Sequence, residues 1–411
     1  MHAVSHDMNT PGRAFRVAVL TSTRADYGHL YWLIRALQEN PDTCPLVYAT
    51  GTHLSDEHGG TITVLEADEV PVHREVPIWE GPDTSEAITA GLGRAVERIG
   101  AALGEDRPDV MVVLGDRSEA LAVALACVVV GVPVAHLHGG EVSRGSLDEL
   151  FRHAITKLAS LHFPATEAYA QRIRQMGEDP AAVHAIGAPG LDHLARSRLL
   201  DRDELEDRLG AKLGGPLAVV TYHPVTTDPA GTERSLAALL DGIAAVSHLR
   251  AVFTGSNADE GGARIDERVR AFCAEHPERF SFFQSLGTQA YLSMLRICDV
   301  VVGNSSSGII EAPSFGVPTV NVGPRQEGRT RATSVIDVRD DAATITAAVT
   351  RALSSEFRDL ARRTMNPYDT AGDGAVSQRI VEKLVTALRQ GLTTAKRFND
   401  LDSVPNVTGA R

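Results

Sequence analysis

Glycines and hydroxyl side chains are concentrated in the stretch GNSSSGIIEAPSFG, which begins at Gly303. It follows Val300–Val302, a short apolar run that is typical of a buried strand. We expect a helix to begin near Ser306, where unpaired backbone amides and the helix dipole favour an anion. Gly303 and Gly308 would let a phosphate approach the backbone closely.

Glu311 would lie one turn further along this helix, where its carboxylate could accept hydrogen bonds from ribose hydroxyls. The stretch therefore predicts a nucleotide-diphosphate site without a Walker lysine or a GxGxxG motif. The alternative is a capped strand-to-helix turn, because serine is a good N-cap residue.

Four polar or charged side chains follow predicted strands in the first half of the chain. The strands are 15–22, 46–50, 110–114 and 132–137, and the side chains are Arg24, His53, Asp116 and His138. Strands that alternate with helices predict a parallel sheet, whose carboxyl ends form the ligand-binding edge. A guanidinium at that edge suits a diphosphate, although Arg24 could instead pair with Asp26 on the surface.

A helix over 146–160 follows the fourth strand, with Ser146 as its cap and Asp148 and Glu149 in its first turn. Glu149, Arg152 and His153 have i, i+3, i+4 spacing and share one helix face. The alternative is a solvated charged face, but because the helix follows a strand end we expect this face to border the ligand-binding edge of the sheet.

The same pattern recurs in the second half, with predicted strands over 217–222, 249–254, 280–283, 300–302 and 317–322. We interpret the charged segment 196–213, which ends in Gly214-Gly215-Pro216, as the linker region. The expected divisions are a tail over 1–14, a first Rossmann-like domain over 15–195, a second over 196–371, a helix over 372–392 and a polar tail over 393–411.

Composition sets limits on the class of protein. The 411 residues are 43% hydrophobic and 23% charged, with a formal net charge of −13. This balance is ordinary for a globular protein and argues against nucleic acid or membrane as a partner. The four cysteines have no metal-site spacing, and 1–12 lacks a signal-peptide core, so we expect reduced core cysteines in a cytoplasmic protein.

Taken together, the motifs resemble those of the UDP-N-acetylglucosamine 2-epimerase family, in particular its hydrolysing branch in sialic acid and nonulosonate biosynthesis. The matching strings cover about 15–340 and are STRADYG, GDRSE, HLHGGE, LDELFRHAITKLAS, HPVT, TGSNADEGG, GNSSSGIIEAPSFG and GPRQEGRTRATSVI. The resemblance implies the α/β GT-B fold, with two Rossmann-like domains that face a central cleft. It also implies that the helix near 375–388 returns to the first domain and that the protein is a homodimer.

The resemblance further implies roles for individual residues. The acid–base and catalytic positions are Asp116, His138, Glu141, Asp148, Glu149 and His223. The UDP-binding positions are Arg24, Gly28, Arg117, His223, Asn257, Ser305, Ser306, Glu311 and Arg325. Some relatives have glutamate at the position of His138, which leaves the assignment of the proton-transfer group open.

The implied reaction converts UDP-N-acetylglucosamine and water to N-acetylmannosamine and UDP through a 2-acetamidoglucal. It needs no cofactor and no metal, because arginines and helix amides neutralise the diphosphate. The same chemistry on a UDP- or GDP-linked 2,4-diacetamido-2,4,6-trideoxy sugar is an alternative. A GT-B glycosyltransferase, a non-hydrolysing epimerase and a catalytically silent nucleotide-sugar sensor are the others.

Overall fold

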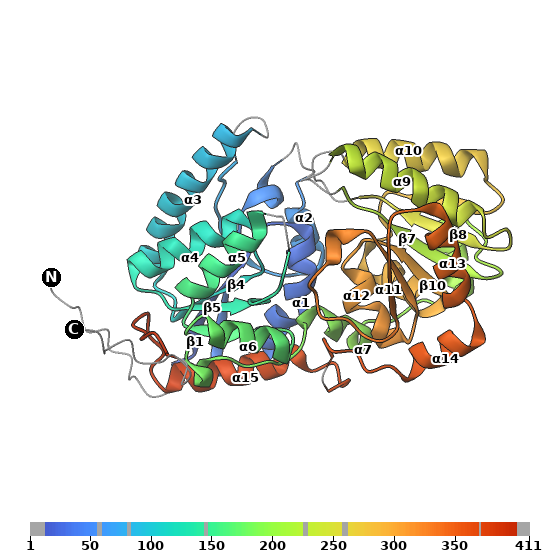
Figure 1. Cartoon of the computed structure of the whole chain (residues 1–411). Coiled ribbons are helices and arrows are strands. Elements are labelled where there is room, and N and C mark those ends of the chain that lie inside the picture. Colours follow the sequence, from blue (N-terminus) through green and yellow to red (C-terminus); the bar gives the residue numbers. More distant parts are fainter. Residues whose placement is uncertain are drawn as a thin grey trace, which may run out of the picture. The chain divides into compact units, whose positions relative to one another are not determined.

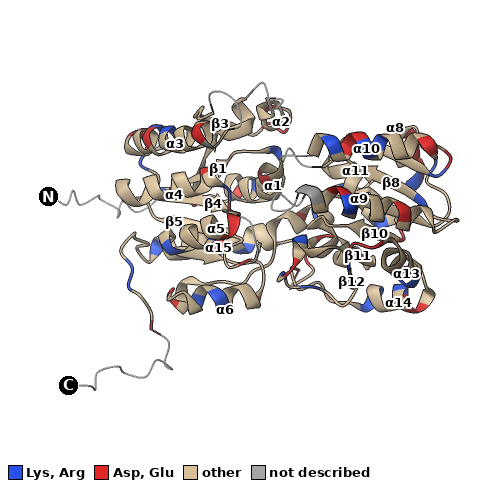
Figure 2. Ribbon diagram, turned by 45° about the horizontal axis from the view of Figure 1, so that its top comes forward, with Lys and Arg blue, Asp and Glu red and all other residues tan. Residues whose placement is uncertain are grey.

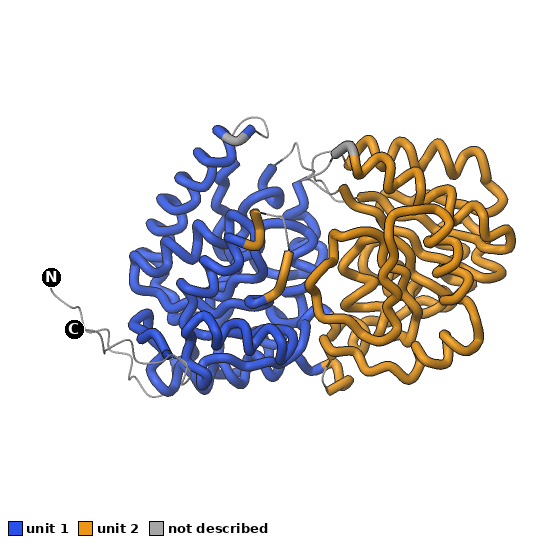
Figure 3. Tube along the Cα trace, viewed as in Figure 1, with its two compact units in different colours: residues 1–140, 150–190, 375–411 blue, residues 141–149, 191–374 orange. Residues whose placement is uncertain are grey.

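The structure, a computed structural model, describes residues 13–55, 60–79, 84–143, 147–224, 229–256, 262–369 and 371–400. The chain forms two compact units, shown in different colours in Figure 3. Unit 1 contains 1–140, 150–190 and 375–411, and unit 2 contains 141–149 and 191–374. The predicted site residue Asn257 lies outside the described residues.

Unit 1 contains a parallel six-stranded sheet among its described residues (Figure 1). The strand order is β3-β2-β1-β4-β5-β6, which is the usual Rossmann order. In such sheets ligands bind at the carboxyl ends of the strands, where the order reverses, and here that point lies between β1 and β4. The strands are β1 Phe15–Thr21, β2 Thr43–Ala49, β3 Val72–Glu75, β4 Val110–Leu114, β5 Val134–Leu137 and β6 Leu161–Phe163.

Alternate side chains of these strands enter two apolar cores. Val17 and Val112 pack on the face covered by α1 and α15, whereas Ala18 and Met111 pack on the face covered by α3 and α4. The C-terminal helix α15 contacts α1 directly. The helices are α1 Arg24–Glu39, α2 Ile62–Ala67, α3 Ser85–Asp106, α4 Ser118–Val130, α5 Leu147–Leu158, α6 Glu167–Gln175 and α15 Val376–Arg389, with 3₁₀ turns Gly51–Leu54, Pro180–Ala182 and Pro189–Leu191.

Unit 2 repeats the same topology. Its parallel sheet has the order β9-β8-β7-β10-β11-β12, so the reversal lies between β7 and β10. The strands are β7 Leu217–Thr221, β8 Arg250–Thr254, β9 Phe280–Phe283, β10 Val300–Gly303, β11 Thr319–Val322 and β12 Val335–Val338. The helices are α7 Asp192–Arg196, α8 Arg202–Leu209, α9 Pro229–Ala244, α10 Gly262–Glu275, α11 Gly287–Ile297, α12 Ser307–Ile310, α13 Ala342–Ala352 and α14 Ser355–Arg363, with 3₁₀ turns Ala312–Phe315 and Pro324–Gln326.

The segment that we interpreted as a linker contains a helix, so that interpretation is wrong for 202–209. Asp201 and Glu204 form a capping box at the start of α8, and Leu205 is fully buried in a core with Leu292 and Leu295. A helix with one strongly buried apolar residue has a weak periodic signal, which explains why its charged surface suggested a linker. The strands β3 and β12 and the helix α14 were not predicted.

The chain after α15 is attached to unit 1 by specific contacts. Lys396 Nζ lies 2.6 Å from a carboxylate oxygen of the buried Glu178, and the Asn399 amide donates to the Gly177 carbonyl at 2.9 Å. Three of the four free cysteines are buried, whereas Cys44 is exposed. None of the helices in the described part of the chain is long and apolar enough to cross a membrane.

Candidate active-site residues

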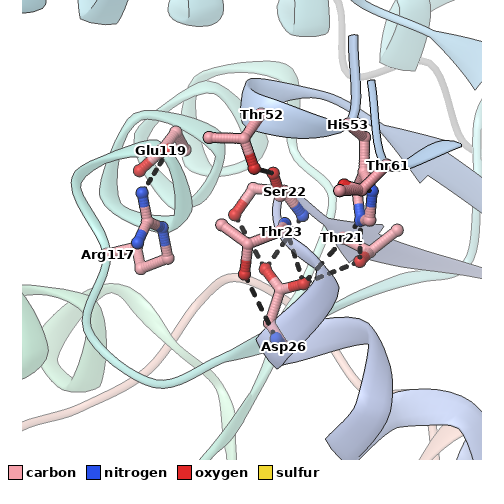
Figure 4. A network of polar contacts seen from close by, with 9 residues as sticks. All are labelled: Thr21, Ser22, Thr23, Asp26, Thr52, His53, Thr61, Arg117 and Glu119. Carbon is pink, nitrogen blue, oxygen red and sulfur yellow. Dashed lines mark hydrogen bonds and ion pairs between the residues drawn. The ribbon is translucent and has the colours of Figure 1, made fainter. Parts of the chain in front are cut away.

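The turn between β1 and α1 is fixed by the carboxylate of Asp26 (Figure 4). It accepts hydrogen bonds from the Thr21 hydroxyl at 2.8 Å, from the Ser22 amide and hydroxyl at 2.9 and 2.7 Å, and from the Thr23 amide at 3.0 Å. The Thr23 hydroxyl in turn accepts from the Asp26 amide, which completes a capping box. Asp26 therefore shapes the turn that carries Arg24.

Arg24 is the first residue of α1 and is exposed at the sheet edge. Gly28 lies one turn further, where an added Cβ would meet no atom within 4 Å. The two predicted nucleotide-binding positions of this turn thus share one face of α1 and have open space beside Gly28.

His53 holds the turn after β2 against the end of β1 (Figure 4). Its side chain is fully buried, with Nε2 2.9 Å from the Thr21 hydroxyl and Nδ1 2.9 Å from the Thr61 hydroxyl. Burial lowers the pKa of His53, and the nearby Asp26 carboxylate opposes this shift only in part. A neutral imidazole between two hydroxyls supports the sheet edge more than it suits proton transfer.

Asp116 follows β4 and forms an ion pair with Arg152 of α5. The Arg152 side chain is 2% exposed and that of Asp116 is 25% exposed, so the cation is buried while the carboxylate reaches the surface. The neighbouring Arg117 donates to the fully buried Glu119 at 3.0 Å and leaves part of its guanidinium exposed. The edge beyond β4 thus presents one oriented carboxylate and one arginine.

His138 follows β5, the strand next to β4, and has a left-handed backbone with φ of 60°. Its ring lies 6.2 Å from the ring of His29 on α1. His136 is different, because it is fully buried, 2.7 Å from the Gly115 carbonyl and 3.3 Å from the Thr156 hydroxyl. His136 is therefore a packed core histidine.

The helix α5 brings three of these groups to one face. Glu149 accepts a hydrogen bond from the Ser143 amide, Arg152 pairs with Asp116, and Thr156 reaches His136. Asp148 lies beside this face and is exposed. Among the described residues of unit 2, the buried Glu141 lies 3.6 Å from the guanidinium of Arg329, which was not predicted as a site residue.

The reversal point of the second sheet is occupied by His223 and Asn304. The Asn304 Oδ1 accepts from the His223 amide at 2.7 Å, and its Nδ2 donates to the His223 carbonyl at 2.8 Å. The Asn304 carbonyl accepts from Arg325 Nη1 at 3.1 Å and from Gln326 Nε2 at 2.8 Å. One buried asparagine thus joins the loops after β7, β10 and β11.

The electrostatic setting of His223 is set by burial and by a neighbouring cation. Burial, together with the Arg325 guanidinium, lowers the pKa of His223 to about 3. The imidazole is therefore neutral near pH 7 in the protein without bound nucleotide. A bound diphosphate would offset the arginine charge and favour the protonated ring.

The serine turn differs in part from the prediction. Ser306 precedes a helix of only four residues, Ser307–Ile310, and Glu311 lies at its junction with a 3₁₀ turn. A Cβ at Gly303 would collide with the Thr221 carbonyl, and one at Gly308 with Thr319. Both glycines are thus required by packing against the sheet, whatever their role toward a phosphate. Ser305 and Ser306 remain half-buried at the edge.

Tyr291 of α11 contacts the serine turn, and nothing in its sequence position distinguishes it from a core aromatic residue. Its hydroxyl donates to Ser307 at 2.7 Å, and burial raises the pKa of the phenol. Among the described residues, no group of three or more histidine, cysteine, aspartate or glutamate side chains is arranged to hold a metal ion.

Comparisons with known proteins give the family. The family model of UDP-N-acetylglucosamine 2-epimerase matches residues 35–385. A GDP/UDP-N,N'-diacetylbacillosamine 2-epimerase (hydrolyzing) of Campylobacter jejuni is 35% identical over 78% of this chain and 84% of its own. The polysialic acid biosynthesis protein P7 of Escherichia coli is 32% identical over 96% of this chain and 98% of its own.

A solved S. aureus structure, determined with UDP, matches 94% of this chain and all of its own with a TM-score of 0.73 at 19% identity. Such structural neighbours have the GT-B-like fold, so the predicted α/β fold of two Rossmann-like units is confirmed. With matching motifs, sheet topology and relatives in agreement, the chain belongs to the UDP-N-acetylglucosamine 2-epimerase family.

Proposed function

We propose that the protein is a hydrolysing 2-epimerase that converts UDP-N-acetylglucosamine and water to N-acetylmannosamine and UDP. The observation that carries this proposal is the placement of Asp116, His138 and Glu149. Asp116 and His138 follow adjacent strands. Glu149 shares a face of α5 with Arg152, which pairs with Asp116. Such acid–base groups suit proton removal and return at one carbon atom.

The first half of the reaction breaks two bonds. A base takes the proton from C2 of the sugar, the C1–O bond to the diphosphate breaks, and its electron pair leaves with UDP. A C1–C2 double bond remains, which gives a 2-acetamidoglucal. We assign the acid–base work to Asp116, His138, Glu141, Asp148 and Glu149 as a group.

The second half adds water across that double bond. The hydroxyl joins C1, and a proton reaches C2 on the face opposite to the one from which the first proton left. The product is N-acetylmannosamine. Two proton-transfer groups of different proton affinity suit these opposite-face steps.

The nucleotide-binding role belongs to two sets of residues in this proposal. In unit 2 the set contains His223, Ser305, Ser306, Glu311 and Arg325, which surround the strand reversal of the second sheet. Arg24, Gly28 and Arg117 are the contribution of unit 1. By its motif, Asn257 belongs to the unit 2 set. Cationic and hydroxyl groups of this kind stabilise the negative charge that develops on the departing UDP.

A diacetamido-trideoxy sugar linked to UDP or GDP is the second candidate substrate. It is favoured by the similarity to the Campylobacter jejuni protein, whose name gives that substrate class. The acid–base chemistry at C2 is the same for both sugars, so the two candidates differ in the groups on the sugar ring and, for a GDP-linked sugar, in the nucleotide base.

We also propose that the protein is a homodimer that uses the outer face of α4. This helix has the sequence SEALAVALACVVV, whose only charged residue is Glu119. Figure 2 accordingly draws α4 almost entirely in tan. Leu125, Val129 and Val130 are exposed on it, Val129 by 78%. Contiguous exposed apolar residues are typical of surfaces that bind another protein chain.

Proton NMR of the purified protein with UDP-N-acetylglucosamine in deuterium oxide tests the reaction. Free N-acetylmannosamine with deuterium at C2, together with UDP, is the expected result. UDP-N-acetylmannosamine would instead indicate a non-hydrolysing epimerase. Turnover of only the UDP- or GDP-linked diacetamido sugar would favour the second candidate, and no turnover of any of them would refute both.

A further inference from the structure

Asn304 is the point at which three ligand-facing loops of the second sheet meet. Its side chain is 1% exposed, so it has no direct access to solvent or ligand. Its side-chain oxygen accepts from the His223 amide, and its side-chain nitrogen donates to the His223 carbonyl. A side chain thus makes the two-point pairing that neighbouring strands make with their backbones. His223 therefore has little freedom to move away from the strand reversal.

The backbone of Asn304 holds the third loop. Its carbonyl oxygen accepts from the side chains of Arg325 and Gln326, which follow β11. Gly303, with φ of 131°, lets the chain press against the Thr221 carbonyl immediately before Asn304. The position of Asn304 relative to the sheet is thus fixed by both β7 and β10.

We propose that Asn304 is a positioning residue that places His223 and Arg325 together for the diphosphate, without contacting it. This inference rests on the proposed nucleotide site. His223 and Arg325 lie on loops that follow different strands. Each loop could therefore move by itself without disrupting the strand that precedes it. The hydrogen bonds of Asn304 to both loops hold them as one unit, so less free energy is spent on ordering them when an anion binds.

The measurement is the Kd for UDP, by titration calorimetry, of the full chain and its variants. Asn304→Ala should raise this Kd at least about tenfold, because two buried hydrogen bonds to His223 are lost. Asn321→Ala is the matched control, since Asn321 is equally buried in the same sheet but donates to Asp337 instead of a loop. It should leave the Kd within about twofold of the original value while lowering the melting temperature.

A double-mutant cycle separates positioning from general destabilisation. If the Asn304 side chain acts through His223, the losses from Asn304→Ala and His223→Ala should not add, whereas those from Asn321→Ala and His223→Ala should add. Asn304→Ser removes the two-point pairing with His223 without adding a charge beside the diphosphate site, so it serves if the alanine variant does not fold.

The outcomes are distinct. An unchanged Kd in a folded Asn304 variant, an equal loss in the Asn321 control, or additive losses with His223→Ala would each overturn the positioning role. Failure of the unaltered protein to bind UDP would instead refute the proposed nucleotide site itself.

Discussion

Arg152 reaches from α5 to the carboxylate of Asp116 at the end of β4, and its guanidinium is almost fully buried while the carboxylate is not. Burying a cation is costly unless it is paired. The pair therefore fixes the orientation of the Asp116 carboxylate relative to α5. It also ties α5, which carries Glu149, to the loop after β4.

Replacement of Arg152 by methionine should remove this ion pair with little change in side-chain volume. We expect the turnover number to fall by about 100-fold or more, because a misoriented proton-transfer group loses most of its contribution. KM should change less, since Arg152 does not contact the nucleotide in our proposal. Initial rates of UDP release, measured over a range of substrate concentrations, test this.

Arg74→Met is the control for the Arg152 variant. Arg74 also pairs with an aspartate of unit 1, Asp106, through two hydrogen bonds of 2.8 Å, but at the outer edge of the sheet. Its loss should lower the melting temperature and leave turnover nearly unchanged. Equal losses of turnover in both variants would mean that Arg152 is only structural.

Glu149→Gln should nearly abolish turnover and leave UDP affinity almost intact. The amide oxygen can still accept from the Ser143 amide, so the local structure is kept while the basic carboxylate is lost. Rates of product formation and calorimetric UDP binding are the two readouts. Glu167→Gln, at an exposed ion pair on α6, is the control that should keep full activity. Normal turnover of the Glu149 variant would rule out its catalytic role.

Glu311→Ala should chiefly weaken nucleotide binding. A carboxylate that accepts hydrogen bonds from ribose hydroxyls contributes about 1.5–3 kcal/mol, so the Kd for UDP should rise by about 10- to 100-fold. Glu327→Ala removes an exposed carboxylate of the same unit and should not affect the Kd. If UDP affinity is the same in both variants, the ribose role of Glu311 is wrong.

The sheet edges were predictable from the sequence because apolar runs followed by polar turns mark the carboxyl ends of parallel strands. β10 and the turn after it are an example, and so are β4 and Asp116. The strands β3 and β12 were missed because VHRE and VIDV are short and carry charges. Both are edge strands with little burial, so their sequences contain no continuous apolar run.

The contacts that the site residues make were harder to predict from the sequence than the site residues themselves. Arg152 was placed on the face of Glu149 by its spacing, but its pairing with Asp116 depends on how α5 lies over β4 and β5. Asn304 belongs to the serine-rich motif, yet nothing in its spacing indicates His223, which lies 81 positions away. Contacts between loops that follow different strands require the strand order, and one sequence does not provide it.

Val129→Asp tests the proposed dimer. Val129 is the most exposed apolar residue of α4, and a buried charge at an interface between two copies would be strongly unfavourable. Light scattering coupled to size exclusion should show a dimer for the unaltered protein and a monomer for the variant. Met365→Asp, at an equally exposed residue of unit 2, should remain a dimer. A dimer that persists in the Val129 variant would exclude this face of α4.

The protein should lose stability as the pH falls from about 6.5 to 5, and His223 should cause part of that loss. Burial and Arg325 lower the pKa of His223 from 6.5 to about 3, so the unfolded chain binds a proton in this range and the folded protein does not. The stabilising contribution is thus complete above about pH 6.5 and decreases toward pH 3, by up to about 1.4 kcal/mol per pH unit. Burial also lowers the pKa values of His53, His162 and His184.

Denaturant unfolding of the nucleotide-free protein at several pH values measures this dependence. His223→Asn should reduce the slope of unfolding free energy against pH between 6.5 and 5, because one proton-binding difference is removed. The exposed His248→Asn should leave the slope unchanged. The depressed carboxyl pKa of Glu178 contributes only at lower pH, below about 4.5, so it does not obscure the comparison. Equal slopes for the His223 variant and the unaltered protein would show that His223 is not held neutral.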